Sequence, residues 1–182
     1  MKKNLLMVAM LAALAVPAVS SAVEVKGTWG LGYVRPEFPI GARIWATEKV
    51  GVDLGVGFLN LSPDGGDSQT AIGFDAGLPY VVHSTDNAHF FVRPGVSFAS
   101  DGGDDATQDG KETQLWVSGT LGAEYFFTPN FSIQAAHGIV YKSIKNEYTP
   151  TGGNKTEVKL STFGSEDFGI SNIGFHYYFG GK

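Results

Sequence analysis

The sequence predicts an all-β fold, an eight-stranded antiparallel up-and-down β-barrel, and three observations lead to this prediction. Large apolar residues alternate with small or charged residues along most of the chain, which is the two-residue period of β-strands. The connections between these segments are alternately short and long. Segments with the 3.6-residue period of amphipathic helices are scarce, so a helical bundle is not expected.

In each expected strand one face is large and apolar, whereas the other face is rich in glycine or charged. The segment "GVDLGVGF" places Val52, Leu54 and Val56 on one face and Asp53 with three glycines on the other. The segments "AIGFDAGLPYV" and "LWVSGTLGAEYFF" repeat this pattern. The alternation predicts strands over residues 25–35, 39–48, 50–61, 69–84, 88–100, 113–127, 131–145 and 158–179.

The connections between these strands fall into two groups. The turns near Glu48, Thr85 and Thr128 are tight. At the other end, "RPEF" from Arg35 is of modest length. The connections that contain "SPDGGDSQ", "SDGGDDATQDGKE" and "NEYTPTGGNKTEV" are long and polar. An even number of strands, with short turns at one end and long loops at the other, is typical of a transmembrane β-barrel. Both termini are then expected at the short-turn end.

The N-terminal residues 1–22 have the pattern of a cleaved signal peptide. Lys2 and Lys3 precede an apolar run over residues 5–16, which is too short to span a bilayer as a helix, and small residues follow at 20–22. Residues 23–182 are expected to form a single barrel domain. The chain has no Cys, so closed backbone ladders rather than disulfides would hold it together.

The composition bears on which strand face lies inside and on which partners bind. Charged residues make up only 17% of the chain, and its 25 glycines suit a narrow barrel interior. We therefore expect the apolar faces to contact lipid; the alternative, a periplasmic lipocalin-like barrel, would turn them inward. The net charge of −5 comes without a basic cluster, which argues against a nucleic-acid partner.

Strand alternation predicts a polar cluster in the barrel interior. Because an eight-stranded barrel is just wide enough for its own side chains, charges there must pair with one another. We expect this cluster to be an ion-pair plug; a catalytic carboxylate pair is the alternative, but carboxylates surrounded by arginine make poor acid–base catalysts. The predicted members are Lys26, Arg43, Asp53, Asp75, Arg93 and Glu124.

The last strand, "NIGFHYYF", carries the most specific pattern in the chain. It combines a polar residue, a glycine and two spaced aromatics at Asn172, Gly174, Tyr177 and Phe179. With this ending, residues 23–182 resemble the small eight-stranded outer-membrane barrels, such as the OmpA transmembrane domain, OmpX and related porin-like surface proteins. The resemblance implies that the barrel assembly machinery reads these four residues as an assembly signal, although family members usually end on the last aromatic and Gly180–Lys182 follow here.

The same resemblance implies a location in the outer membrane of a Gram-negative cell envelope, with membrane lipid and lipopolysaccharide as neighbours and periplasmic termini. Some barrels of this kind are lipid A deacylases or acyltransferases, and the deacylases carry a His-x-Ser-Asn pattern. His137 falls on the predicted lipid face, but Gly138 and Ile139 follow it, so this pattern is absent. Residues 101–112 echo a calcium loop, yet Gly103 and Ala106 stand where an acid and a glycine are needed.

We therefore expect a protein that is not an enzyme and has no catalytic residues, no metal site and no cofactor. Its expected role is structural, adhesive or surface-interacting, with long acidic extracellular loops, a plugged interior and an unknown surface ligand. A narrow porin or OmpW-like conduit for small or hydrophobic molecules is the alternative function. A lipid A-modifying enzyme is the third.

Overall fold

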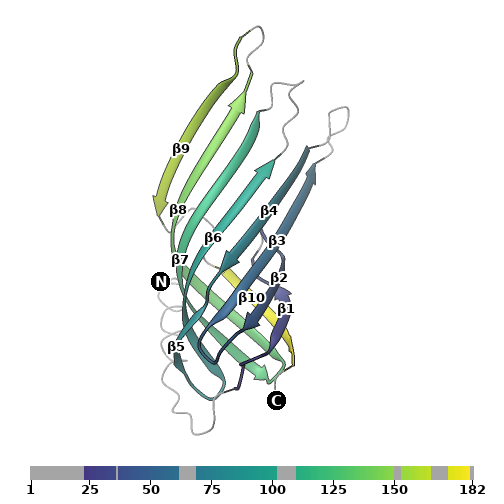
Figure 1. The fold of residues 1–182 in the computed structure, drawn as a ribbon, viewed down its shortest axis with the longest axis vertical. Coiled ribbons are helices and arrows are strands. Elements are labelled where there is room, and N and C mark those ends of the chain that lie inside the picture. Colours follow the sequence, from purple (N-terminus) through teal and green to yellow (C-terminus); the bar gives the residue numbers. More distant parts are fainter. Residues whose placement is uncertain are drawn as a thin grey trace, which may run out of the picture.

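The computed structural model describes residues 23–35, 37–61, 69–101, 110–149, 153–164 and 172–180. The regular structure of these residues is entirely β, as predicted, and Figure 1 shows its strands. None of the described residues forms a helix that is long and apolar enough to cross a membrane. The strands are β1 Trp29–Tyr33, β2 Ile40–Trp45, β3 Gly51–Leu61, β4 Gln69–Gly77, β5 Tyr80–Ser84, β6 Ala88–Asp101, β7 Lys111–Thr128, β8 Phe131–Tyr148, β9 Thr156–Gly164 and β10 Asn172–Phe179.

These segments close into an eight-stranded antiparallel barrel, which confirms the predicted fold class. Closure occurs where β10 pairs with both β1 and β8. The ten strands form eight barrel staves because two staves are each made of two consecutive strands. β4 and β5 both pair with β6, and β9 and β10 both pair with β8.

The structure corrects three predicted strand boundaries. The segment predicted as one strand over 69–84 is interrupted at Pro79, because proline has no N–H to donate to a sheet ladder. The segment predicted over 158–179 consists of β9 and β10, whose partners on β8 are separated by residues 137–139. The first strand begins at Trp29, after a turn in which Gly27 has a φ of 76°.

The strands differ greatly in length, and this shapes the molecule. β7 and β8 have 18 residues each, whereas β1 has 5 and β2 has 6. The longer strands, together with β9, therefore continue beyond the closed barrel as a curved sheet, which we call the open sheet (Figure 1). The described chain ends both lie at the short-turn end: Val23 N–H donates to Asp86 O, and Tyr178 N–H donates to Asn130 O.

The interior contains two apolar clusters that flank a layer of charged side chains. The cluster at the short-turn end includes Trp45, Phe126 and Tyr178, and the second cluster consists of Phe38, Trp116 and Val140. The outward faces carry large apolar side chains that are exposed on the isolated barrel, such as Leu121. The polarity of the barrel is thus inverted relative to a water-soluble domain.

Candidate functional site: the ionic interior

The centre of the charged layer is Arg43, which extends from β2 and is fully buried. Its Nε and Nη2 donate to the two oxygens of Asp53 at 2.6 and 2.8 Å, a bidentate pair with the residue directly opposite on β3. Its Nη1 donates to Glu124 Oε2 on β7 at 2.7 Å. One guanidinium therefore joins three strands through two carboxylates.

Arg93, on β6, extends this arrangement across the barrel. Its Nε donates to Asp53 Oδ2 at 2.7 Å, and its Nη2 donates to Asp75 on β4. Asp75 Oδ1 accepts a further hydrogen bond from Arg35 Nη2 at 2.9 Å. The result is a chain of alternating charge, which runs Glu124, Arg43, Asp53, Arg93, Asp75, Arg35; we call these six residues the ionic network.

The ionic network is buried and balanced in charge. Its six side chains are at most 9% exposed, and three cations face three anions. Charges held away from water must be paired and hydrogen-bonded, because an uncompensated buried ion is strongly destabilising. Aromatic rings lie beside two of the arginines: Arg43 lies 5.6 Å from the Trp45 ring centre, and Arg35 lies 4.7 Å from that of Phe38.

The structure brings Arg43, Asp53, Asp75, Arg93 and Glu124 together, as strand alternation predicts, but Lys26 does not join them. This corrects the prediction for Lys26, which lies exposed in the turn before β1, where two-residue alternation does not apply. Its place in the charge balance is taken by Arg35, which sequence reasoning assigned to a connection.

Arg35 reaches the interior because the described residues of the β1–β2 connection, 34–35 and 37–39, fold into the barrel. Phe38 is 1% exposed, and its N–H donates to Arg35 O at 3.0 Å. Glycines on the facing strands make this possible: a Cβ at Gly57 would lie 2.1 Å from Glu37 O, and one at Gly73 would lie 2.5 Å from Phe38 Cε1. We call residues 34–35 and 37–39 the inner loop. The inward glycines of β3 and β4 were the sequence signal that could have revealed it.

The C-terminal strand is tied to the ionic network by its inward side chains. Tyr178 Oη donates to Glu124 Oε1 at 2.7 Å and accepts from Trp45 Nε1 at 3.3 Å. Ser132 Oγ also donates to Glu124 Oε1, at 2.5 Å, and His176 Nδ1 lies 3.7 Å from the same oxygen. Glu124 thereby connects β2, β7, β8 and β10.

The predicted assembly-signal residues lie on both faces of β10. Tyr177 and Phe179 point outward, and Phe179 stacks on Trp29 of β1 with ring centres 4.7 Å apart. Gly174 is buried where β10 meets β1, since a Cβ there would lie 2.5 Å from Tyr33 O. Asn172 is half-buried at the start of the strand.

Several other sequence predictions fall elsewhere. His137 is exposed on the outward face, as strand alternation predicts. Among the described residues, no group of three His, Cys, Asp or Glu side chains could hold a metal ion. The predicted signal peptide at 1–22, most of the predicted long loops and residues 102–109 of the calcium-like stretch lie outside the described residues.

The ionic network fills the barrel interior with side chains that are paired with one another. Asp53, Asp75 and Glu124 all accept hydrogen bonds from buried arginines, so their carboxylate oxygens are already engaged by partners within the barrel. In a comparison with models of protein families and with curated proteins, the sequence has no match.

Proposed function

We propose that this chain is an integral outer-membrane β-barrel with a sealed interior and a non-enzymatic structural or surface-interaction role. The observation that carries the proposal is the inverted polarity of the barrel. Six charged side chains lie inside it, whereas Leu121, Phe127 and Ile173 on its outer wall are 68, 59 and 70% exposed. An apolar wall of this extent needs a hydrocarbon surrounding or a very large partner surface.

The outer wall also has a boundary at which its polarity changes. Along the outward face of β8, Ile139 and Tyr141 are followed by Lys145 and Glu147. On neighbouring β9 the outward Phe163, which pairs with Tyr141, is followed toward the loop by charged residues. An aromatic pair at the edge of an apolar band is typical of the girdle of a membrane barrel. The sheet beyond this boundary would therefore stand in water on the cell surface.

The sealed interior favours the structural role over the alternative of a conduit. The ionic network crosses the lumen from β7 through β2, β3 and β6 to β4, and the inner loop adds Phe38 beside Trp116. A solute would have to displace these side chains to pass. The parts offered to other molecules are then the outer wall and the open sheet.

Membrane insertion tests the proposal. The full chain, expressed in a Gram-negative host, should enter the outer-membrane fraction and migrate differently on gels before and after boiling. The variant Tyr177→Ala/Phe179→Ala should be depleted from that fraction, because it lacks the aromatics of the assembly signal. Phe175→Ala, an outward aromatic of the same strand outside the signal pattern, is the matched control.

Accumulation of the wild-type chain as a water-soluble protein would contradict the membrane location. Normal amounts of the folded double variant in the membrane would leave the location intact and remove the assembly-signal role from Tyr177 and Phe179.

A further inference from the structure

We infer that the outer wall carries a binding groove for one acyl chain of a membrane phospholipid. The groove lies over β3, β4 and β6 and has a volume of about 320 Å³. This volume is at the lower end of the range for small-molecule sites, roughly 300–1,000 Å³. The inference rests on the proposed membrane location and adds a specific ligand site to it.

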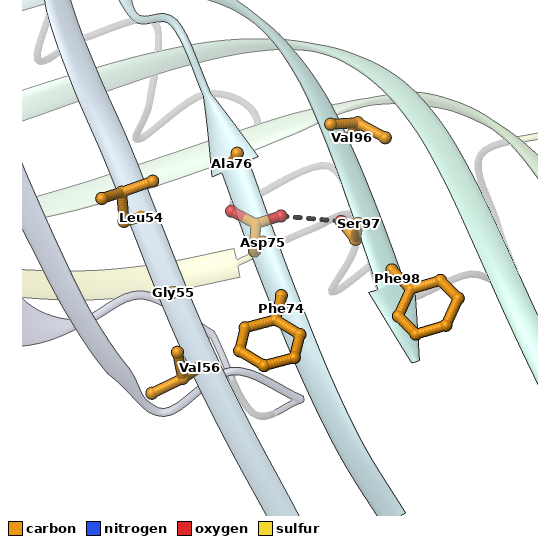
Figure 2. Close-up of a pocket in the computed structure, with 9 residues that line it drawn as sticks. All are labelled: Leu54, Gly55, Val56, Phe74, Asp75, Ala76, Val96, Ser97 and Phe98. Atoms are coloured by element: carbon orange, nitrogen blue, oxygen red, sulfur yellow. Dashed lines mark hydrogen bonds between the residues drawn. The ribbon is translucent and has the colours of Figure 1, made fainter. Parts of the chain in front are cut away.

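The groove arises from one small residue between two larger ones. Ala76 of β4 is paired with Leu54 of β3 on one side and with Val96 of β6 on the other. Its methyl group forms the floor, and the longer side chains of its two neighbours form the walls. Figure 2 shows the next row of the same strands, in which the rings of Phe74 and Phe98 stand beside the groove.

The lining offers no hydrogen-bonding group to a ligand. Asp75 and Ser97 contribute to the floor, but their side chains are buried, and Ser97 Oγ donates to Asp75 Oδ1 at 2.7 Å (Figure 2). Arg35 and Arg93 engage Asp75 from the interior. A sugar, peptide or nucleotide in the groove would lose hydrogen bonds to water without replacement. An alkyl chain has none to lose.

The surroundings of the groove favour a lipid chain over a second copy of the protein. Specific protein interfaces have an apolar centre within a polar rim. Here the neighbouring outward side chains are apolar as well: Phe58 is 78% exposed, Ile72 is 50% and Val117 is 52%. The groove is therefore continuous with the apolar wall, as a site entered from the hydrocarbon layer would be.

The test fills the groove with a larger side chain and measures how many lipid molecules stay bound to the protein. Wild type, Ala76→Phe and Ala123→Phe are folded into vesicles of dipalmitoyl phosphatidylethanolamine, extracted with detergent and weighed by native mass spectrometry. Ala123 is the matched control, because it is also a half-buried outward alanine but lies on β7, away from the groove. We expect wild type and Ala123→Phe to retain one phospholipid. Loss of the burial of about two methylene groups should reduce retention by Ala76→Phe about tenfold.

The outcomes separate the groove from the membrane location. Insertion of each sample is read independently from its heat-dependent gel mobility. If the proteins insert but wild type retains no phospholipid, or Ala76→Phe retains as much as wild type, the groove is not a lipid site. A parallel arm with free palmitate tests the source: retention of palmitate without phospholipid would overturn a phospholipid chain as the occupant. Failure of all three proteins to insert would overturn the membrane location and the groove with it.

Discussion

Two groups of ion pairs in this molecule have similar lengths and opposite surroundings. In the interior, Arg43 Nε lies 2.6 Å from Asp53 Oδ1, and both side chains are at most 1% exposed. In the open sheet, Lys145 Nζ lies 2.5 Å from Glu147 Oε1, with side chains 38 and 20% exposed. Lys155 also pairs with Glu147, and Glu157 pairs with Lys145 and Lys159. We call these five residues the surface network.

The comparison shows that distance alone says little about what an ion pair contributes. Water screens the surface network and solvates its charges when a pair separates, so exposed pairs of this kind contribute little to stability. The side chains of the ionic network are at most 9% exposed, so solvent has little access to a charge that loses its partner. Removing one of its members leaves a charge buried and unpaired, which costs far more than the pair itself contributes.

The networks also differ in what they connect. The ionic network joins residues from β2, β3, β4, β6 and β7 with the inner loop, so it fixes strands against one another across the lumen. The surface network joins only neighbouring β8 and β9 and the residues next to them. The ionic network therefore stabilises the closed barrel, whereas the surface network stabilises only the local pairing of β8 and β9.

The largest effect is expected for Arg43→Ala. This change leaves Glu124 with no arginine and Asp53 with Arg93 alone, so we expect the free energy of unfolding to fall by about 3–5 kcal/mol. Urea unfolding of the barrel in lipid vesicles measures the loss.

Two further variants sharpen this result. Arg43→Met/Glu124→Gln removes both charges and should recover part of the loss. Arg93→Ala should cost less than Arg43→Ala, because each of its carboxylate partners keeps a second arginine. An equal or smaller loss in Arg43→Ala would mean that the interior is wet enough to solvate a free carboxylate.

A smaller effect is expected where the inner loop meets β3. In Gly57→Ala the new Cβ would lie 2.1 Å from Glu37 O, so the inner loop must shift. We expect a loss of about 1–3 kcal/mol, typical of overpacking. Gly119→Ala is the control, because a Cβ there has no atom within 4 Å. Equal stability of the two variants would place the inner loop outside the barrel.

The smallest effect is expected in the surface network. Hydrogen bonds from Lys145 and Lys155 lower the pKa of Glu147 from its ordinary 4.5 to about 2. A carboxyl group with a lowered pKa stabilises the folded sheet above pH 4.5, and this contribution disappears as the pH falls toward 2. Glu147→Gln should therefore lower the urea midpoint at pH 7 only slightly, because water screens exposed pairs, and this difference from wild type should disappear as the pH falls toward 2. An NMR titration should place the wild-type Glu147 midpoint well below 4.5. A midpoint at the ordinary value would mean that these pairs do not persist in water.

The inward and outward faces of most strands could be predicted from the sequence, because successive side chains along a strand point to opposite faces. Alternation alone places Arg43, Asp53 and Glu124 on the inner faces of their strands, whereas the register between β2 and β3 sets Asp53 opposite Arg43. The same rule cannot reach Arg35, since the inner loop has no period and its path depends on glycines two strands away. It also misplaces Lys26, which the turn at Gly27 takes out of the strand.

The prediction of one strand over 69–84, where the structure has β4 and β5, was wrong for a different reason. Proline is disfavoured inside a sheet, so Pro79 was a readable signal for an interruption between Gly77 and Tyr80. The groove at Ala76, in contrast, depends on the register between β3, β4 and β6, which pairs its floor with its walls. Periodicity within one strand does not contain this register.

The most direct test of the sealed interior is the ion conductance of the wild-type barrel in a planar lipid bilayer. A lumen crossed by the ionic network and covered by the inner loop should show little or no steady current under applied voltage. Arg93→Ala should then be less stable than wild type, because it leaves Asp53 and Asp75 each with one arginine fewer. Stable ohmic conductance by the wild type, with Arg93→Ala changing ion selectivity but not stability, would contradict the sealed barrel and favour a narrow porin.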